Sequence, residues 1–333
     1  MRPPAEIRRW VAALGASALF VAGLIWLGAL DDVPRLLRRL PGSAVALAFA
    51  WLVVAGGLRA VRLRWMLPTR PPLFTAYAIN QIYNLGTAVI PTGLGEVFGV
   101  WFLGRRLAVP VGSAAAVLLI GRVLDITILL VMFLAAFVAG AVAVGSAQRA
   151  LVAIALVAIG IVALAVTFRS HLAARARVLL RGWKQAANAP APLRNAVAAV
   201  LHIFDDFAAV ALAPQSWLLL VITTAASQFA NLQSLRVLLA GVDRPTDFSG
   251  ALAIFVVYLL LRVLPVQGLA GVGTHATWWA LALVVVGVGR NESLPIGAVL
   301  YLAYMVLLVL LCATGAPLLW LGARTHRITM DDA

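Results

Sequence analysis

Residues 73–104 read LFTAYAINQIYNLGTAVIPTGLGEVFGVWFLG, an apolar run of 32 residues. Its flanks carry the basic residues Arg70, Arg105 and Arg106. Because basic flanks of membrane segments favour the cytoplasm, both ends are predicted to lie on the cytoplasmic side. Two full crossings need about 40 residues, and the centre contains three helix-breaking residues, Pro91, Gly93 and Gly95. The run therefore predicts a re-entrant hairpin whose irregular tip is buried in protein or faces water.

The composition of the whole chain places this hairpin in a membrane protein. Of the 333 residues, 63% are hydrophobic and only 11% are charged, whereas a soluble domain needs far more polar surface. The apolar segments are continuous, which is typical of membrane helices, while the strands of a β-barrel alternate apolar and polar residues. We therefore expect an all-α polytopic membrane protein, with a single transmembrane domain over residues 1–333.

The remaining apolar segments predict about six full transmembrane helices and a second broken hairpin. The expected crossings are 10–30, 42–57, 107–148, 151–168, 216–241 and 295–322. The second hairpin lies within 248–288, and it is interrupted by Pro265, Gly268, Gly271 and Gly273. The positive-inside rule then puts both termini in the cytoplasm. It also puts four arginines on the cytoplasmic side, after the second crossing: Arg59, Arg62, Arg64 and Arg70.

The two broken segments occupy comparable places in the two halves of the chain, one entering from the inside and one from the outside. Transporters built from inverted repeats place their binding sites at such interruptions. The alternative is two ordinary Gly/Pro kinks packed against neighbouring helices.

The net charge of +14, from 26 basic and 12 acidic residues, collects mainly beside the apolar segments. This distribution fits membrane topology, and no nucleic-acid partner is expected. The densest basic run opens a cytoplasmic loop at 169–212. Within this loop, helical spacing of apolar residues over 193–208 fits either an interfacial amphipathic helix or a plain connector.

A few charged residues fall within the apolar segments, where each costs about 2.5 to 3.5 kcal/mol. Arg122 and Asp125 are three residues apart and can pair on one helical face. Alternatively, Arg122 or Arg262 presents its guanidinium to a lipid phosphate, and Glu96 carries a proton or neutralises an arginine. Amides and other polar groups can line a groove near them or join helices: Asn80, Gln81, Asn84, Gln228, Asn231, Gln233, Gln267, Thr274 and His275.

Motifs of catalysis are absent from the sequence. There is no GxxxxGK[ST], HExxH or GxSxG motif, and the four histidines are scattered. The single Cys312 allows no multi-cysteine metal site. We expect no enzyme activity, no cofactor and no metal. Asp31 and Asp32 leave one enzymatic alternative, because membrane-embedded polyprenyl-phosphate-dependent glycosyltransferases carry paired acids in their first external loop. A solvated turn before Pro34 is the simpler interpretation of this pair.

Three stretches resemble the transmembrane region of the lysylphosphatidylglycerol synthases, a flippase-like family. Leu58 to Trp65 is similar to the family's arginine-rich helix end, Asn84 to Glu96 to its N...P-x-x-x-GE signature, and Arg122 to Asp125 to its R-x-x-D signature. The cluster from Pro265 to Gly273 looks like the second P...GG-x-G break. The chain departs from the usual charged residues at Gly99, Gly121, Thr274 and His275.

The resemblance implies lipid translocation. Since no aminoacyl-transfer domain follows the last helix, we expect translocation without lipid aminoacylation. The expected function is that of a flippase-like protein of the bacterial cytoplasmic (inner) membrane, moving an anionic phospholipid or a polyprenyl-phosphate-linked lipid. The candidate substrate-binding residues are Asn84, Glu96, Arg122, Asp125, Arg262, Gln267 and Arg59. Expected partners are membrane lipids, and beyond them a second copy or a lipid-modifying enzyme. A non-catalytic alternative is a membrane partner protein whose basic loop docks anionic lipid or a cytoplasmic enzyme.

Overall fold

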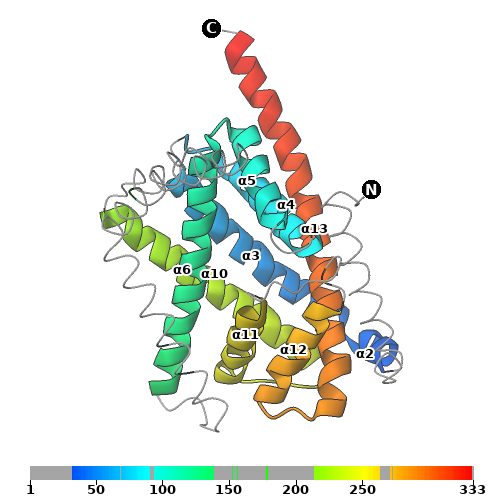
Figure 1. The fold of residues 1–333 in the computed structure, drawn as a ribbon. Coiled ribbons are helices and arrows are strands. Elements are labelled where there is room, and N and C mark those ends of the chain that lie inside the picture. The colour runs from blue at the N-terminus through cyan, green and yellow to red at the C-terminus, as the bar shows by residue number, and fades with distance from the viewer. Residues whose placement is uncertain are drawn as a thin grey trace, which may run out of the picture.

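The computed structural model describes residues 32–67, 69–90, 94–138, 152, 156, 178, 214–262, 271 and 273–331. These residues form helices and no strands (Figure 1). The helices are α2 (Val33–Arg39), α3 (Gly42–Met66), α4 (Leu73–Val89), α5 (Leu94–Leu107), α6 (Val111–Val138), α10 (Pro214–Gly241), α11 (Phe248–Arg262), α12 (Thr274–Val285) and α13 (Arg290–Asp331). The all-α prediction is confirmed for this part of the chain.

Four of the described helices are long and apolar enough to cross a membrane. They are α3, α6, the part of α10 over Ser216–Gly241 and the part of α13 over Arg290–Gly315. Large apolar side chains point outward from them: Val54, Leu119 and Val306 are about half exposed. Outward-facing apolar residues are stable where lipid replaces water as the solvent. The chain is therefore a multi-pass membrane protein, and these helices confirm four of the expected crossings.

Both interrupted segments are pairs of short helices, as the sequence predicts. Helices α4 and α5 pack against each other across the interruption after Ile90, and α11 and α12 do the same across the interruption after Arg262. The α4–α5 pair lies at one end of the molecule and the α11–α12 pair lies toward the other (Figure 1). Re-entry into the membrane and an inverted repeat stay predictions.

Helix α3 corrects one expectation about the arginines. The second crossing was predicted to end near residue 57, with the following arginines in the cytoplasm. Instead α3 continues to Met66, so that Arg59 and Arg62 lie within the helix. Arg62 is only 6% exposed. Arg62 can lie inside the protein because a carboxylate on a distant helix accepts its guanidinium, as described below.

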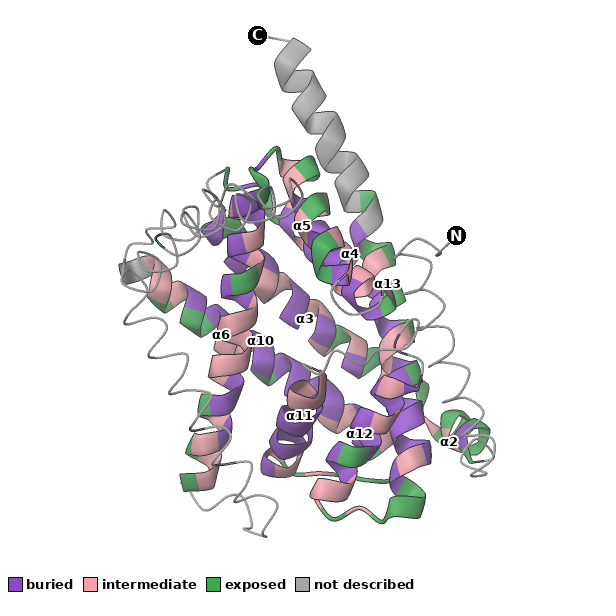
Figure 2. Ribbon diagram, viewed as in Figure 1, coloured by how far each residue is buried: buried purple, intermediate pink, exposed green. Residues whose placement is uncertain are grey.

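Two apolar clusters form the core. The larger one joins α6 and α10 to α13 and includes Phe133, Leu239 and Leu252. The smaller one joins α3 to α6 and includes Leu63 and Val117. Buried residues follow the inward faces of the helices (Figure 2).

Two glycines permit close contacts between the helices. A Cβ atom on Gly95 would lie 2.9 Å from the backbone of Thr87, so that only glycine allows α5 to approach α4 this closely. In the second break, Gly273 precedes α12 with a φ of 87°, a conformation that side chains strongly disfavour.

Several predicted features lie outside the described residues. They are the first crossing at 10–30, Asp31, the hairpin tip with Pro91 and Gly93, the crossing at 151–168 apart from residues 152 and 156, the loop at 169–212 apart from residue 178, and Pro265, Gln267 and Gly268.

Candidate functional site

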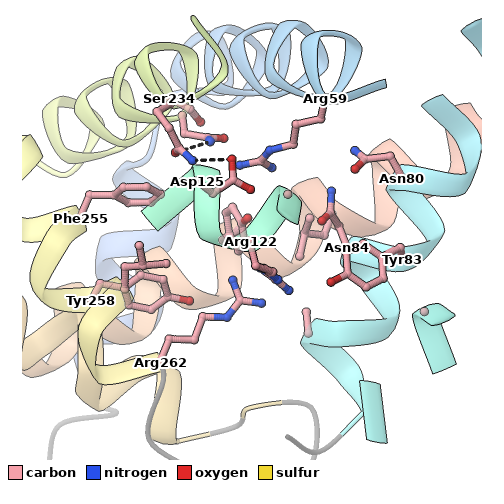
Figure 3. Close-up of a pocket in the computed structure, with 18 of the residues that line it drawn as sticks. Arg59, Asn80, Tyr83, Asn84, Arg122, Asp125, Ser234, Phe255, Tyr258 and Arg262 are labelled. Carbon is pink, nitrogen blue, oxygen red and sulfur yellow. Dashed lines mark hydrogen bonds between the residues drawn. The ribbon is translucent and has the colours of Figure 1, made fainter. Parts of the chain in front are cut away.

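A cavity of about 110 Å³ lies between the two apolar clusters, and residues of α3, α4, α5, α6, α10, α11, α12 and α13 line it. A void needs about 10 to 15 Å³ to hold one water, so this cavity has room for several waters or a small polar group. Its polar lining comes from Arg59, Arg62, Asn80, Tyr83, Asn84, Arg122, Asp125, Gln228, Asn231, Ser234, Tyr258, Arg262, His275, Tyr301 and Tyr304. Figure 3 shows arginines from three helices directed into this space.

A buried ion pair closes one side of the cavity. Arg62 Nη1 donates to Asp125 Oδ1 at 2.7 Å, and Arg62 Nη2 donates to Asp125 Oδ2 at 3.0 Å. Thr224 Oγ1 accepts a further bond from Arg62, and Gln228 Nε2 donates to Asp125. This bidentate pair joins the middle of α6 to α3 and α10, because both charges are satisfied only when the three helices meet.

A second ion pair lies closer to the protein surface. Arg122 Nη2 donates to Glu96 Oε1 at 2.8 Å, and Tyr83 Oη donates to Glu96 Oε2 at 2.5 Å. The Arg122 guanidinium also lies over the Tyr83 ring, 5.5 Å from its centre. Through these contacts Glu96, at the start of α5, attaches the α4–α5 pair to α6.

Glu96 and Arg122 border a second cavity of about 430 Å³. Arg122, Asp125 and Arg262 line both cavities, so the two adjoin each other.

Two cavity arginines differ from these pairs. Among the described residues, neither Arg59 nor Arg262 forms a hydrogen bond or an ion pair. Within the same part of the chain, the Nε atoms of Arg59 and Arg62 and the amide nitrogen of Asn80 are buried without a hydrogen-bond partner. All three atoms are donors, and all three residues line the cavity. Buried polar groups are normally satisfied, so the arrangement favours a ligand that brings acceptor oxygens.

The second half of the chain supplies an aromatic wall. Tyr258 Oη lies 2.9 Å from His275 Nδ1, and the Tyr258 ring stacks on Trp279 with 3.8 Å between ring centres. His275 is 3% exposed. This packing holds the end of α11 against α12 and thereby positions Arg262, which is one turn after Tyr258.

The structure brings five of the seven predicted site residues to the first cavity: Asn84, Arg122, Asp125, Arg262 and Arg59. Glu96 lines the adjoining cavity, and Gln267 lies outside the described residues. Their role in binding a substrate stays a prediction. Asn80, Gln228, Asn231 and His275 also line the first cavity. In contrast, Gln233 accepts a hydrogen bond from Arg236, away from the cavity.

The pairing suggested for Arg122 and Asp125 is wrong. Asp125 pairs with Arg62 and Arg122 pairs with Glu96, so each residue of the R-x-x-D motif has its partner on another helix. The second suggestion for Glu96, that it neutralises an arginine, is confirmed.

Tyr83 and Thr224 were not singled out from the sequence. Tyr83 lies one residue before Asn84, and this proximity was the one available signal. Thr224 lies 162 residues from Arg62, and no sequence pattern connects them.

Among the described residues, the acidic side chain of Asp32 does not form part of this site. Asp32 is exposed and pairs with Arg35 at 3.0 Å, and it lines neither cavity. Within the described residues, no group of three or more His, Cys, Asp or Glu side chains is placed to hold a metal ion.

A family model described as the lysylphosphatidylglycerol synthase TM region matches residues 10–319, nearly the whole chain. No curated protein and no solved structure matches the chain.

Proposed function

The chain belongs to the family of the lysylphosphatidylglycerol synthase transmembrane region, and from this premise we propose that it moves anionic lipids across the membrane. The cargo is an anionic phospholipid or a polyprenyl-phosphate-linked lipid, and the membrane is the bacterial cytoplasmic membrane. The protein acts as a flippase-like carrier and not as an enzyme. Its polar headgroup site is the cavity lined by Arg59, Arg122 and Arg262.

The observation that carries this proposal is the excess of hydrogen-bond donors in the cavity. The unpartnered buried atoms of its lining, on Arg59, Arg62 and Asn80, are donors. Phosphate oxygens accept several such bonds, and guanidinium groups bind them with two parallel bonds. A neutral or cationic headgroup would leave these donors unsatisfied, which costs about 1 to 3 kcal/mol for each buried group.

The position of the cavity supports movement as well as binding. Its lining includes residues of α4 and α11, the first helices of the two interrupted pairs. Interrupted helices are the elements around which membrane carriers build a polar path. The lipid tails remain in the bilayer while the headgroup passes along the two adjoining cavities. The Glu96–Arg122 pair, which borders the second cavity, must separate as the headgroup passes.

No observation favours the glycosyltransferase alternative. Asp32 pairs with Arg35 on the surface and lines neither cavity. The alternative of a docking protein depends on the loop at 169–212, nearly all of which lies outside the described residues.

The test is lipid translocation in proteoliposomes that contain a trace of lipid labelled with a fluorophore on an acyl chain. A membrane-impermeant reductant bleaches the labels in the outer leaflet, and the protein should add a phase in which inner-leaflet anionic lipid becomes accessible. The variant Arg262→Gln should remove most of this phase, whereas the matched surface variant Arg35→Gln should retain it. The proposal is contradicted if folded wild-type protein translocates no anionic lipid faster than empty vesicles do.

A further inference from the structure

The charges of the two adjoining cavities do not balance. Their lining carries four arginines, Arg59, Arg62, Arg122 and Arg262, against two carboxylates, Glu96 and Asp125. The described lining thus has an excess of two positive charges. The two arginines without a carboxylate partner, Arg59 and Arg262, are half-buried, and a charge withdrawn from water without a counter-charge is costly. The excess therefore favours a ligand of matching negative charge.

The geometry assigns the excess to particular residues. Arg62 is bound by Asp125, and Arg122 is bound by Glu96. The two remaining guanidinium groups are those of Arg59 on α3 and Arg262 at the end of α11. In Figure 3 they enter the cavity from different helices, with Arg122 drawn between them. A ligand that neutralises both must therefore present charge on more than one side.

We propose that this site selects a phosphate group with two negative charges, a phosphomonoester or a diphosphate, over the singly charged phosphodiester of common phospholipids. The proposal rests on the proposed function for its location in the membrane. A terminal phosphate carries about −1.5 to −2 at pH 7 and has three strong acceptor oxygens. A phosphodiester carries one charge and has two free oxygens, so it leaves one of the two arginines without a counter-charge.

The test compares two lipids with identical acyl chains, phosphatidic acid as the phosphomonoester and phosphatidylglycerol as the phosphodiester. Binding to the full-length protein in detergent is measured by displacement of a fluorescent anionic lipid. At pH 7.5 phosphatidic acid should bind about tenfold tighter or more, because its second charge meets an unpaired guanidinium in a low-dielectric site. Inorganic phosphate is the tail-free probe in the same assay.

The pH dependence comes from the ligand. The second pKa of a phosphomonoester is about 6, so most of the phosphatidic acid carries one charge at pH 5. Its advantage over phosphatidylglycerol should therefore shrink severalfold between pH 7.5 and pH 5. Phosphatidylglycerol does not titrate in this range and provides the internal reference at each pH.

Two variants locate the selectivity. Arg59→Gln and Arg262→Gln each remove one excess charge, and each should bring the two lipids to similar affinity while binding of phosphatidylglycerol persists. Arg35→Gln, on the surface, should keep the wild-type preference. Thermal unfolding of each variant confirms that it is folded before binding is compared.

The outcomes distinguish the proposed charge selectivity from the proposed carrier function, on which it rests. Equal binding of both lipids by the wild-type protein overturns the charge selectivity and leaves the carrier function standing. Absence of binding to either lipid by folded protein overturns both. Displacement of phosphatidic acid by inorganic phosphate supports the selectivity with free phosphate as a ligand. Binding of phosphatidic acid that phosphate does not displace supports it with the lipid as the ligand.

Discussion

Two arginine–carboxylate pairs of the same chemistry serve the site in different ways. The Arg62–Asp125 and Arg122–Glu96 pairs have similar lengths, 2.7 Å and 2.8 Å. Their surroundings differ, since the side chains of the first pair are 8% and 16% exposed and those of the second are 31% and 48% exposed. Burial, and not the length of the bond, therefore distinguishes the two.

The difference in burial indicates which of the two ion pairs is able to open. Asp125 also accepts a bond from Gln228, and Arg62 also donates to Thr224, so that opening this pair strands several buried groups. Glu96 has Tyr83 as its further partner, and its carboxylate can be solvated where it lies. We infer that the Arg62–Asp125 pair holds α3, α6 and α10 together. The Arg122–Glu96 pair opens and closes the second cavity.

The largest effect is expected from breaking the buried pair. Asp125→Asn leaves the Arg62 charge buried without a counter-charge and should lower the free energy of unfolding by about 3 to 5 kcal/mol. Equilibrium unfolding in mixed micelles with a denaturing detergent measures the loss. The double variant Arg62→Met with Asp125→Leu should recover much of it, because no unpaired charge remains. If Asp125→Asn costs no more than Glu96→Gln, the distinction between the pairs is wrong.

A smaller loss should follow from moving α5 away from α4. Gly95→Ala places a methyl group 2.9 Å from the Thr87 backbone, which should cost about 1 to 3 kcal/mol. It should also displace Glu96 from Arg122 and leave the Arg62–Asp125 pair intact. Gly57→Ala is the matched control, because nothing lies within 4 Å of the added carbon. Equal stability of the two variants would contradict the close packing of this hairpin.

Neutralising Glu96 of the partly exposed pair should change lipid binding more than stability. Glu96→Gln should lower the unfolding free energy by less than about 1 kcal/mol, since partly exposed ion pairs contribute little. It frees Arg122 and adds a third uncompensated charge to the cavities, so the affinity for anionic lipid should rise. Lipid displacement measures the affinity, and weaker binding would show that Glu96 helps to hold the ligand.

The smallest effect is expected at Asp32, which pairs with Arg35 on the first turn of α2. Asp32→Asn should change the unfolding free energy by less than about 0.5 kcal/mol, because exposed pairs three residues apart are weak. Translocation should stay at the wild-type rate. A large loss of translocation with unchanged stability would contradict the assignment of Asp32 to the surface, outside the site.

The fold could be predicted because hydropathy and helix breakers are local signals. The apolar runs located α6 and α10, and the Pro and Gly clusters located both interruptions. The end of α3 could not be predicted in this way. After 16 apolar residues, Arg59 and Arg62 have the appearance of a cytoplasmic flank. The carboxylate that keeps Arg62 inside the protein is 63 residues away in the chain.

The site was predicted as a set of residues but not as a set of contacts. A charge within an apolar segment costs free energy, so the sequence alone indicates Arg122, Asp125 and Arg262 as candidate site residues. Their partners depend on which helices pack together, and spacing along one helix therefore suggested the wrong pair. Tyr83 and Thr224 have no charge and no motif. Only the packing of α4 against α5 and of α10 against α3 reveals their roles.

The central claim, a positively charged and wet cavity inside the membrane domain, is tested most directly by charge-selective labelling of a cysteine in it. The variant Asn84→Cys in a Cys312→Ala background places the sole thiol on the cavity wall. A negatively charged water-soluble thiol reagent should react about tenfold faster than a positively charged reagent of similar size, because the cavity concentrates anions. Anionic lipid should slow this reaction. Equal rates for the two reagents, or a faster reaction with the cationic one, would contradict the account.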